Sequence, residues 1–214
     1  MNVLSIDIGI INLGYVYSEI AYYPDFAYYY YSENETLQSN EVIKIIDCNK
    51  VDITIMKHNT TKFCDCKLHH DNCFPDYLEH FFQEYSEMFN NSKLILVERQ
   101  PITGITNVQD LILNKYREKT ILISPNSVHK HFCMSKNYTT RKKQSELIAM
   151  KYLYHFENFI NKLRKHDISD AMLLILYYYE TVLKKKNSLK NNNIIINPQN
   201  NNIDDLERFR FIKN

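Results

Sequence analysis

Two short apolar segments of this chain each end in an acidic residue, and this feature constrains the fold most. Val3 to Ile8 has the β-branched bias of a buried strand and contains Asp7 near its end, while Lys93 to Val97 is followed directly by Glu98. A carboxylate at the end of a buried strand is unfavourable unless it is paired or bound to a metal ion. If the two strands are neighbours in one sheet, the two acids lie side by side.

The remaining pattern predicts an α/β domain. Further strands are expected at Tyr15 to Tyr23, Glu41 to Asp47 and Thr120 to Ile123. Helical spacing predicts helices at Pro75 to Phe89, Val108 to Lys119, Tyr138 to Phe159 (begun by a Thr139 or Thr140 cap) and about Asp167 to Lys185, with a last short helix at Ile203 to Ile212. Pro24 to Asn40 is expected to be a hairpin loop. The order βββ-α-β-α-β-α-α gives a mixed sheet.

Length and composition exclude several classes of protein. The 214 residues suggest one domain, or one domain with an insertion, and 44% hydrophobic residues are enough for a sizeable core. The longest nearly pure apolar run, Ala171 to Tyr179, is far shorter than the roughly 20 residues that span a bilayer. The first residues lack a basic region, so no signal peptide is expected. Five cysteines, an odd number, fit a reducing compartment rather than a disulfide framework.

Basic residues gather in one segment although the net charge is only +1. Residues 136–165 contain eight lysines and arginines against two acids. Such a segment is typical of contact with nucleic-acid phosphates, and it is also what a solvated helix face looks like. Both interpretations stay open on charge alone.

A second pair of acids has helical spacing. Asp167 and Asp170 are three residues apart, which places both on one face of a helix whose continuation is apolar. If this helix packs over the two acid-bearing strands, four carboxylates converge. Oxygen ligands suit Mg²⁺ or Mn²⁺, and two such ions about 4 Å apart support phosphodiester cleavage. Alternatively, Asp7 opens a turn, Glu98 pairs with a basic residue, and the two aspartates complement a helix dipole.

Four segments resemble the motifs of RuvC-like Holliday junction resolvases, a family within the RNase H-like superfamily. Asp7 to Gly14 resembles the first motif, Val97 to Gln100 the second, and His166 to Ala171 the closing Asp-x-x-Asp-Ala motif; Arg141 to Lys143 lies where these enzymes carry lysines. The similarity looks closest to the poxvirus branch, which fits a composition rich in residues with A/T-rich codons. It covers residues 1–185.

The resemblance implies a fold and an activity. We expect an RNase H-like fold with a mixed five-stranded sheet flanked by helices, spanning residues 1–185 with an enlarged insertion plus helix at 48–91, and then a mobile Lys/Asn-rich extension at 186–214. The implied activity is that of a homodimeric, Mg²⁺-dependent endonuclease, with Mn²⁺ as a substitute. It would cleave four-way DNA junctions by paired symmetric nicks and resolve viral replication and recombination intermediates in the host cytoplasm.

The same resemblance assigns roles to residues. Asp7, Glu98, Asp167 and Asp170 would be metal ligands, with Asp7 bridging two ions. Lys142 or Lys143 would approach the scissile phosphate, and Lys143 is preferred here as the catalytic lysine. The expected DNA contacts are Arg141, Lys142, Lys143 and Lys151. Gly9 and Gly14 would keep the first turn tight and let the DNA backbone approach.

Two features outside these motifs have open interpretations. The ligand types of Cys64, Cys66, His69 and Cys73 are compatible with a structural Zn²⁺ ion, but the spacing is not a standard one, and a thiol-bearing surface insertion explains it equally. Cys133 is expected to be a small core residue. Tyr28 to Tyr31 would stack on unpaired bases or, alternatively, be exposed or dimer-buried strand residues.

Three other functions compete with junction cleavage. An actin-like ATPase or sugar kinase also begins with a strand and Asp-x-Gly, but it needs Gly-rich loops, and this chain has no glycine after Gly104. Another RNase H-like nuclease, acting on RNA–DNA hybrids or flaps, would share the acids. The third is a non-catalytic protein that binds branched DNA. For a homodimer, the helix at 75–89 and the helix around Leu147 to Phe159 are the two candidate interfaces.

Overall fold

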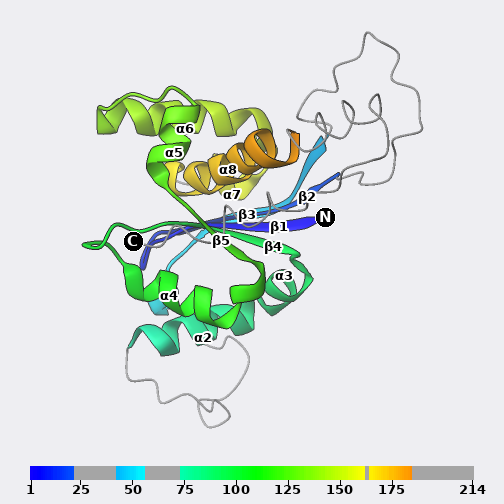
Figure 1. Cartoon of the computed structure of the whole chain (residues 1–214), viewed down its shortest axis with the longest axis vertical. Coiled ribbons are helices and arrows are strands. Elements are labelled where there is room, and N and C mark those ends of the chain that lie inside the picture. Colours follow the sequence, from blue (N-terminus) through cyan, green and yellow to red (C-terminus); the bar gives the residue numbers. More distant parts are fainter. Residues whose placement is uncertain (22–41, 56–72, 162–163, 185–214) are drawn as a thin grey trace, which may run out of the picture.

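A five-stranded sheet between two helical layers forms the centre of the molecule (Figure 1). The computed structural model describes residues 1–21, 42–55, 73–161 and 164–184. Its strands are β1 (Asn2–Asp7), β2 (Leu13–Ile20), β3 (Ile43–Val51), β4 (Leu94–Glu98) and β5 (Thr120–Ile123). The predicted mixed five-stranded sheet is confirmed.

The strand order β3-β2-β1-β4-β5 brings the two acid-bearing strands together. β1 pairs antiparallel with β2 and β2 antiparallel with β3, whereas β4 pairs parallel with both β1 and β5. Ile6 is in register with Val97, so Asp7 and Glu98 follow at adjacent positions. Because parallel strands end at the same edge of a sheet, both carboxylates lie at that edge.

One helical layer covers each face of the sheet (Figure 1). The first layer consists of α2 (Phe74–Glu84), α3 (Ser86–Asn91) and α4 (Thr106–Lys115). The second consists of α5 (Pro125–His131), α6 (Tyr138–Leu153), α7 (Glu157–Ile160) and α8 (His166–Tyr178), which runs on into a π-helical turn, η4 (Tyr179–Leu183). Two short 3₁₀ segments, η1 (Ile53–Ile55) and η3 (Arg117–Lys119), complete the described elements. Each layer buries a separate apolar cluster against its face.

Packing shifts several element boundaries from their predicted positions. β3 continues to Val51 rather than ending at Asp47, because it pairs with β2 along its whole length. The helix expected at 138–159 is interrupted where Phe156 adopts an extended backbone, and α7 follows it. The N-terminal cap of α6 is Asn137 and not Thr139 or Thr140. The Asn137 Oδ1 accepts a hydrogen bond from the Thr140 N–H at 3.0 Å.

Other sequence-based expectations are corrected or lie outside the described residues. Helix α5 was not expected, and the helix expected at 75–89 divides into α2 and α3 at Tyr85. Cys133 is exposed, with φ = 50°, in the turn after α5, so it is not a core residue. The predictions for Pro24 to Asn40, Cys64, Cys66, His69 and residues 186–214 fall on parts that the structure does not describe. Within the described ranges, no helix is long and apolar enough to cross a membrane.

Two contacts fix the position of α8 on the sheet. The Ser5 hydroxyl of β1 is buried and donates a hydrogen bond to the Ala171 carbonyl of α8 at 2.8 Å. Gly14 of β2 has the carbonyl of Asp167 directly above it, because a Cβ built on Gly14 would lie 2.1 Å from that oxygen. The helix can pack this closely only where the strand has no side chain. Gly14 therefore makes room for α8, which corrects its predicted role of admitting DNA.

Candidate active site

Three of the four predicted acids converge at one edge of the sheet. Asp7 ends β1, Glu98 ends β4, and Asp170 lies in the second turn of α8. All three line one cavity, whose other walls come from α5, the segment after it and α8: Pro125, Val128, His129, Met134, Leu173 and Leu174. The cavity therefore has an acidic floor and mainly apolar walls.

Burial and neighbouring charges raise the pKa values of Asp7 and Glu98. Burial raises the pKa of Asp7 well above its ordinary value, and the nearby charges of Glu98 and Asp170 raise it further. Burial also raises the pKa of Glu98, although its hydrogen bond with Asp7 opposes this effect. Carboxylates held together away from water repel each other, and a positive charge placed among them relieves the repulsion.

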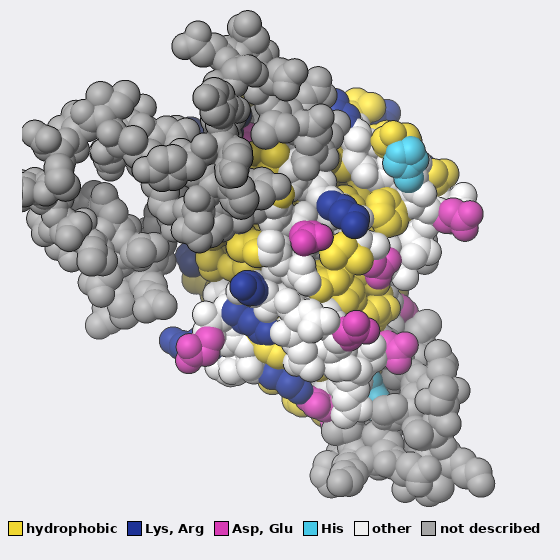
Figure 2. All heavy atoms as spheres, turned by 90° about the vertical axis from the view of Figure 1, so that its right-hand side faces the viewer, with side chains coloured by type: hydrophobic (Ala, Val, Ile, Leu, Met, Phe, Trp, Pro, Cys, Tyr) yellow, Lys and Arg dark blue, Asp and Glu magenta, His cyan; other side chains and the backbone are white. Residues whose placement is uncertain are grey.

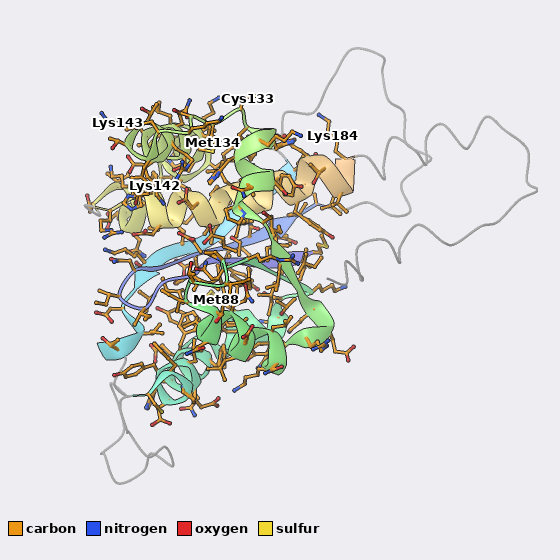
Figure 3. All side chains as sticks on the ribbon, turned by 60° about the vertical axis from the view of Figure 1, so that its left-hand side comes forward. Met88, Cys133, Met134, Lys142, Lys143 and Lys184 are labelled. Atoms are coloured by element: carbon orange, nitrogen blue, oxygen red, sulfur yellow. The ribbon has the colours of Figure 1, made fainter. Side chains whose placement is uncertain are left out.

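Lys142 supplies one such positive charge. Its ammonium group donates a hydrogen bond to Asp170 and forms an ion pair with it. Burial alone would lower the pKa of Lys142, but the charge of Asp170 and the hydrogen bond outweigh burial and raise it. Figure 3 shows Lys142 between α6 and α8 and Lys143 on the outer side of α6. Of the two lysines, only Lys142 thus contacts the acid cluster.

The fourth predicted acid, Asp167, is close to the cluster but does not line the cavity. Its side chain is buried, with Oδ1 3.3 Å from His166 Nε2 and Oδ2 3.3 Å from Arg164 Nε. The Arg164 contact has ion-pair distance but not hydrogen-bond geometry, so Oδ2 has no hydrogen-bond partner. Arg164 is half exposed, and we regard the contact as weak because water screens it. Asp167 Oδ2 is a buried acceptor with unused capacity.

The other predicted basic residues do not line the acidic cavity. Arg141 donates hydrogen bonds to the carbonyls of Ser135 and Lys136. Lys143 and Lys151 are exposed on α6. Lys143 and Lys151 are therefore accessible from solvent, whereas Arg141 is half-buried.

The sequence reasoning missed His129, which comes from α5 and lines the acidic cavity. Burial lowers the pKa of His129, and the charge of Arg141 lowers it further. Pro125 in the first turn of a helix directly after a strand was the sequence signal that could have indicated α5.

The donor chemistry of the cluster suits a hard divalent cation. Asp7, Glu98 and Asp170 offer only carboxylate oxygens, and Asp167 adds a buried oxygen without a hydrogen bond. In the described residues, however, no three His, Cys, Asp or Glu side chains are close enough to form a ready-made metal-binding group. The residues therefore fit the ion by type and burial, and the carboxylates would have to draw together around it.

The predicted zinc ligands remain untested. Cys73 is exposed just before α2, and the other three residues of that set lie outside the described ranges. Cys48 is a cysteine of the core. Its thiol is buried in β3, and burial raises its pKa to about 12.

Comparison with solved structures shows the fold. The chain is similar to the fowlpox virus resolvase in complex with its substrate Holliday junction DNA, with 21% identity and a TM-score of 0.54, covering 86% of this chain and 99% of that one. The structure of the fowlpox virus Holliday junction resolvase alone gives 17% identity and a TM-score of 0.53, covering 86% and 100%. Thermus thermophilus RuvC gives 12% identity and a TM-score of 0.48. No protein-family model matches the sequence, and no curated protein sequence matches it either.

The similarity to the two fowlpox virus structures shows that this chain shares their fold, as predicted. At identities below 25%, it concerns the fold alone. The function of this chain must therefore be argued from its own side chains.

Proposed function

We propose that this protein is a divalent-metal-dependent endonuclease that cleaves four-way DNA junctions. The observation that carries the proposal is the convergence of Asp7, Glu98 and Asp170 in one cavity, with Lys142 bound to Asp170. The fold supports it, because the neighbour whose fold this chain shares is a junction resolvase complexed with such DNA.

The four acids would bind the metal ions from different positions. Asp7, Glu98 and Asp170 would hold the cations, and Asp167, in the preceding turn of α8, would add an oxygen that has no hydrogen-bond partner. Mg²⁺ or Mn²⁺ bound there would activate water and stabilise the leaving oxygen in phosphodiester cleavage. The carboxylates must be ionised to do this, and a divalent cation would offset the repulsion between them.

Lys142 is the stronger candidate for the catalytic lysine. Its ammonium group offsets the charge of Asp170. On a bound substrate the same ammonium group would contact a phosphate oxygen and stabilise developing negative charge there. Arg141 and Lys143, near the beginning of α6, would bind the DNA backbone. Lys151 lies in the second half of the helix, on the same face as the exposed Leu147 and Met150, and would lie at the edge of a contact made there.

Paired nicking requires two active sites, and α6 offers a surface for a second copy. Leu147, Met150 and Tyr154 are exposed at i, i+3 and i+7, while Ser145, Ala149 and Leu153 on the other side of the helix are buried. The other candidate interface, the segment 75–89, offers fewer aromatic side chains to a partner, because Phe81, Phe82 and Phe89 are buried in the core. We therefore place the interface of a C₂ homodimer on α6.

A panel of synthetic substrates tests the proposed function. The wild-type protein with Mg²⁺ should nick a four-way junction and leave a linear duplex of the same sequence intact. Preferred cleavage of an RNA–DNA hybrid or a flap would assign a different RNase H-like activity. Binding of the junction without cleavage of any substrate would indicate a non-catalytic protein.

Mixed dimers test the pairing of nicks. Heterodimers of wild-type and Asp7→Asn chains should cut one strand and leave the symmetry-related strand intact. Two opposed nicks made by a species that stays monomeric during turnover would contradict the dimer.

A further inference from the structure

A lysine outside the predicted site lies in register with the candidate catalytic acids. Lys50 of β3 pairs with Gly14 of β2, and Gly14 pairs with Asp7 of β1. Cys48, two residues before Lys50, belongs to the apolar cluster beneath α8, so the alternation of side chains along β3 directs Lys50 to the same face as Asp7. With strands about 4.8 Å apart, the Cα atoms of Lys50 and Asp7 are roughly 10 Å apart along this row.

The charge of Lys50 is not neutralised within the described residues. Its Nζ donates a hydrogen bond to the neutral side chain of Asn12, at 3.0 Å from Oδ1. In the ranges that the structure describes, it forms no ion pair with a carboxylate. The two acids nearest in sequence are engaged elsewhere: Asp47 accepts a hydrogen bond from Tyr15 and Asp52 accepts two from Thr54.

Asn12 holds Lys50 at the edge of the sheet where the acid cluster lies. The turn between β1 and β2 is tied to the end of β3, because the Ile53 N–H donates to the Ile10 carbonyl at 3.0 Å. Lys50 and Asn12 therefore present ammonium and amide N–H donors on the β3 side of Asp7. Glu98 and His129 lie on the other side of Asp7, toward β5.

We infer that Lys50, positioned by Asn12, binds a phosphate of the DNA backbone on the β3 side of the acid cluster. This inference rests on the proposed function and adds a contact that the basic segment of α6 does not provide. A lysine acts at such a place as a point charge for phosphate.

A second lysine on the same strand provides a matched control. Lysines on edge strands also discourage pairing with other sheets, and β3 is an edge strand. Lys44 is exposed at the beginning of β3, opposite Glu19 of β2. Figure 2 shows one face of the molecule, on which basic, acidic and apolar side chains are interspersed. If Lys50 only protected the edge, the two lysines would behave alike.

The test is the salt dependence of junction binding by the full chain in EDTA, which prevents cleavage. Lys50→Gln should reduce the slope of log K against log[salt] by about 0.9, which is an affinity loss of about eightfold at 0.1 M salt. Lys50→Arg should keep the wild-type slope, since it keeps the charge, and Lys44→Gln should keep it as well. Asn12→Asp should lower the slope with Lys50 present, because the new carboxylate neutralises the ammonium group.

The outcomes separate this inference from the proposed function. A wild-type protein that neither prefers the junction to linear duplex nor cleaves it would contradict the proposed function. A wild-type protein that does both, with an unchanged slope in Lys50→Gln, would overturn only the phosphate contact. An equal loss of slope in Lys44→Gln or in Lys50→Arg would overturn it too, since the effect would then not depend on the charge at this site.

Discussion

The main-chain carbonyl of Asp167 lies directly over Gly14, at 2.1 Å from the position that a Cβ on Gly14 would occupy. This contact joins the first turn of α8 to the strand next to β1. It sets the height of α8 above the sheet, and therefore the distance from Asp170 to Asp7 and Glu98. The acid cluster depends on a glycine that carries no functional group.

Replacing Gly14 should displace the helix. Gly14→Ala must push α8 away from β2 because the obstructing atoms are backbone, so we expect a destabilisation of about 1–3 kcal/mol and a large loss of cleavage. Ser5→Ala is the matched control, because it removes the hydrogen bond to Ala171 without adding volume and should cost only about 1 kcal/mol. Thermal unfolding and junction cleavage check both variants. Full activity of Gly14→Ala would show that α8 need not pack this closely.

The acid cluster should make the metal-free protein less stable as pH rises. The raised pKa of Asp7 means that the folded state binds more protons than the unfolded state between about pH 4, its unfolded pKa, and its folded pKa. Stability from this group is thus fully present below the unfolded pKa and is lost as pH rises through the folded pKa. Asp7→Asn should reduce this loss, by about 1.4 kcal/mol per unit of pKa shift removed.

Denaturant unfolding in EDTA at pH 5 and pH 7 measures this effect. The difference in unfolding free energy between the two pH values is compared for wild type, Asp7→Asn and Glu118→Gln. Glu118 is exposed on η3, so its variant should behave like wild type. An identical pH difference in Asp7→Asn would contradict the repulsion between buried carboxylates.

Replacing Lys142 and replacing Lys143 should have different effects on cleavage and on DNA binding. Lys142→Ala removes the ammonium group that contacts Asp170 and should lower the rate of cleavage by about 10²-fold or more at saturating protein. Lys143→Ala removes an exposed charge and should mainly weaken binding, with a shallower salt dependence. Single-turnover rates against protein concentration measure both effects. The reverse pattern would make Lys143 the catalytic lysine.

The exposed stripe on α6 should hold two chains together. Leu147→Glu places a charge on a surface that a dimer would bury, so it should yield a folded monomer. Ile102→Glu is the control, since Ile102 is 98% exposed in the loop after β4, away from that stripe. Sedimentation equilibrium measures the mass. Dissociation by Ile102→Glu and not by Leu147→Glu would place the interface elsewhere.

The positions of Asp7 and Glu98 at strand ends were predictable because the sequence pattern that marks them is local. An apolar run that ends in Asp or Glu marks the end of a buried strand, and the sheet order then decides only which strands are neighbours. The choice between Asp167 and Asp170 was not predictable. At a spacing of three residues they share a helix face, but their directions differ enough that only Asp170 enters the cavity, and this follows from how α8 packs on Gly14.

The sequence could not show which lysines lie near the acid cluster. Lys142 and Lys143 differ by one position on α6, and the contact between α6 and α8 alone decides which of them reaches Asp170. Lys50 was missed because Asn49 and Lys50 interrupt the apolar alternation after Asp47. Pairing with β2 keeps these residues in the strand, which sequence periodicity does not show.

Junction cleavage by Asp170→Asn, measured beside junction binding, tests the central claim most directly. The substitution removes one carboxylate of the cluster and the ion-pair partner of Lys142 while keeping the side-chain shape. The account predicts that wild-type protein with Mg²⁺ nicks the four-way junction, and that Asp170→Asn binds the same junction at least as tightly but does not cut it. Cleavage by Asp170→Asn at the wild-type rate, with Mg²⁺ present, would contradict an active site built from these acids.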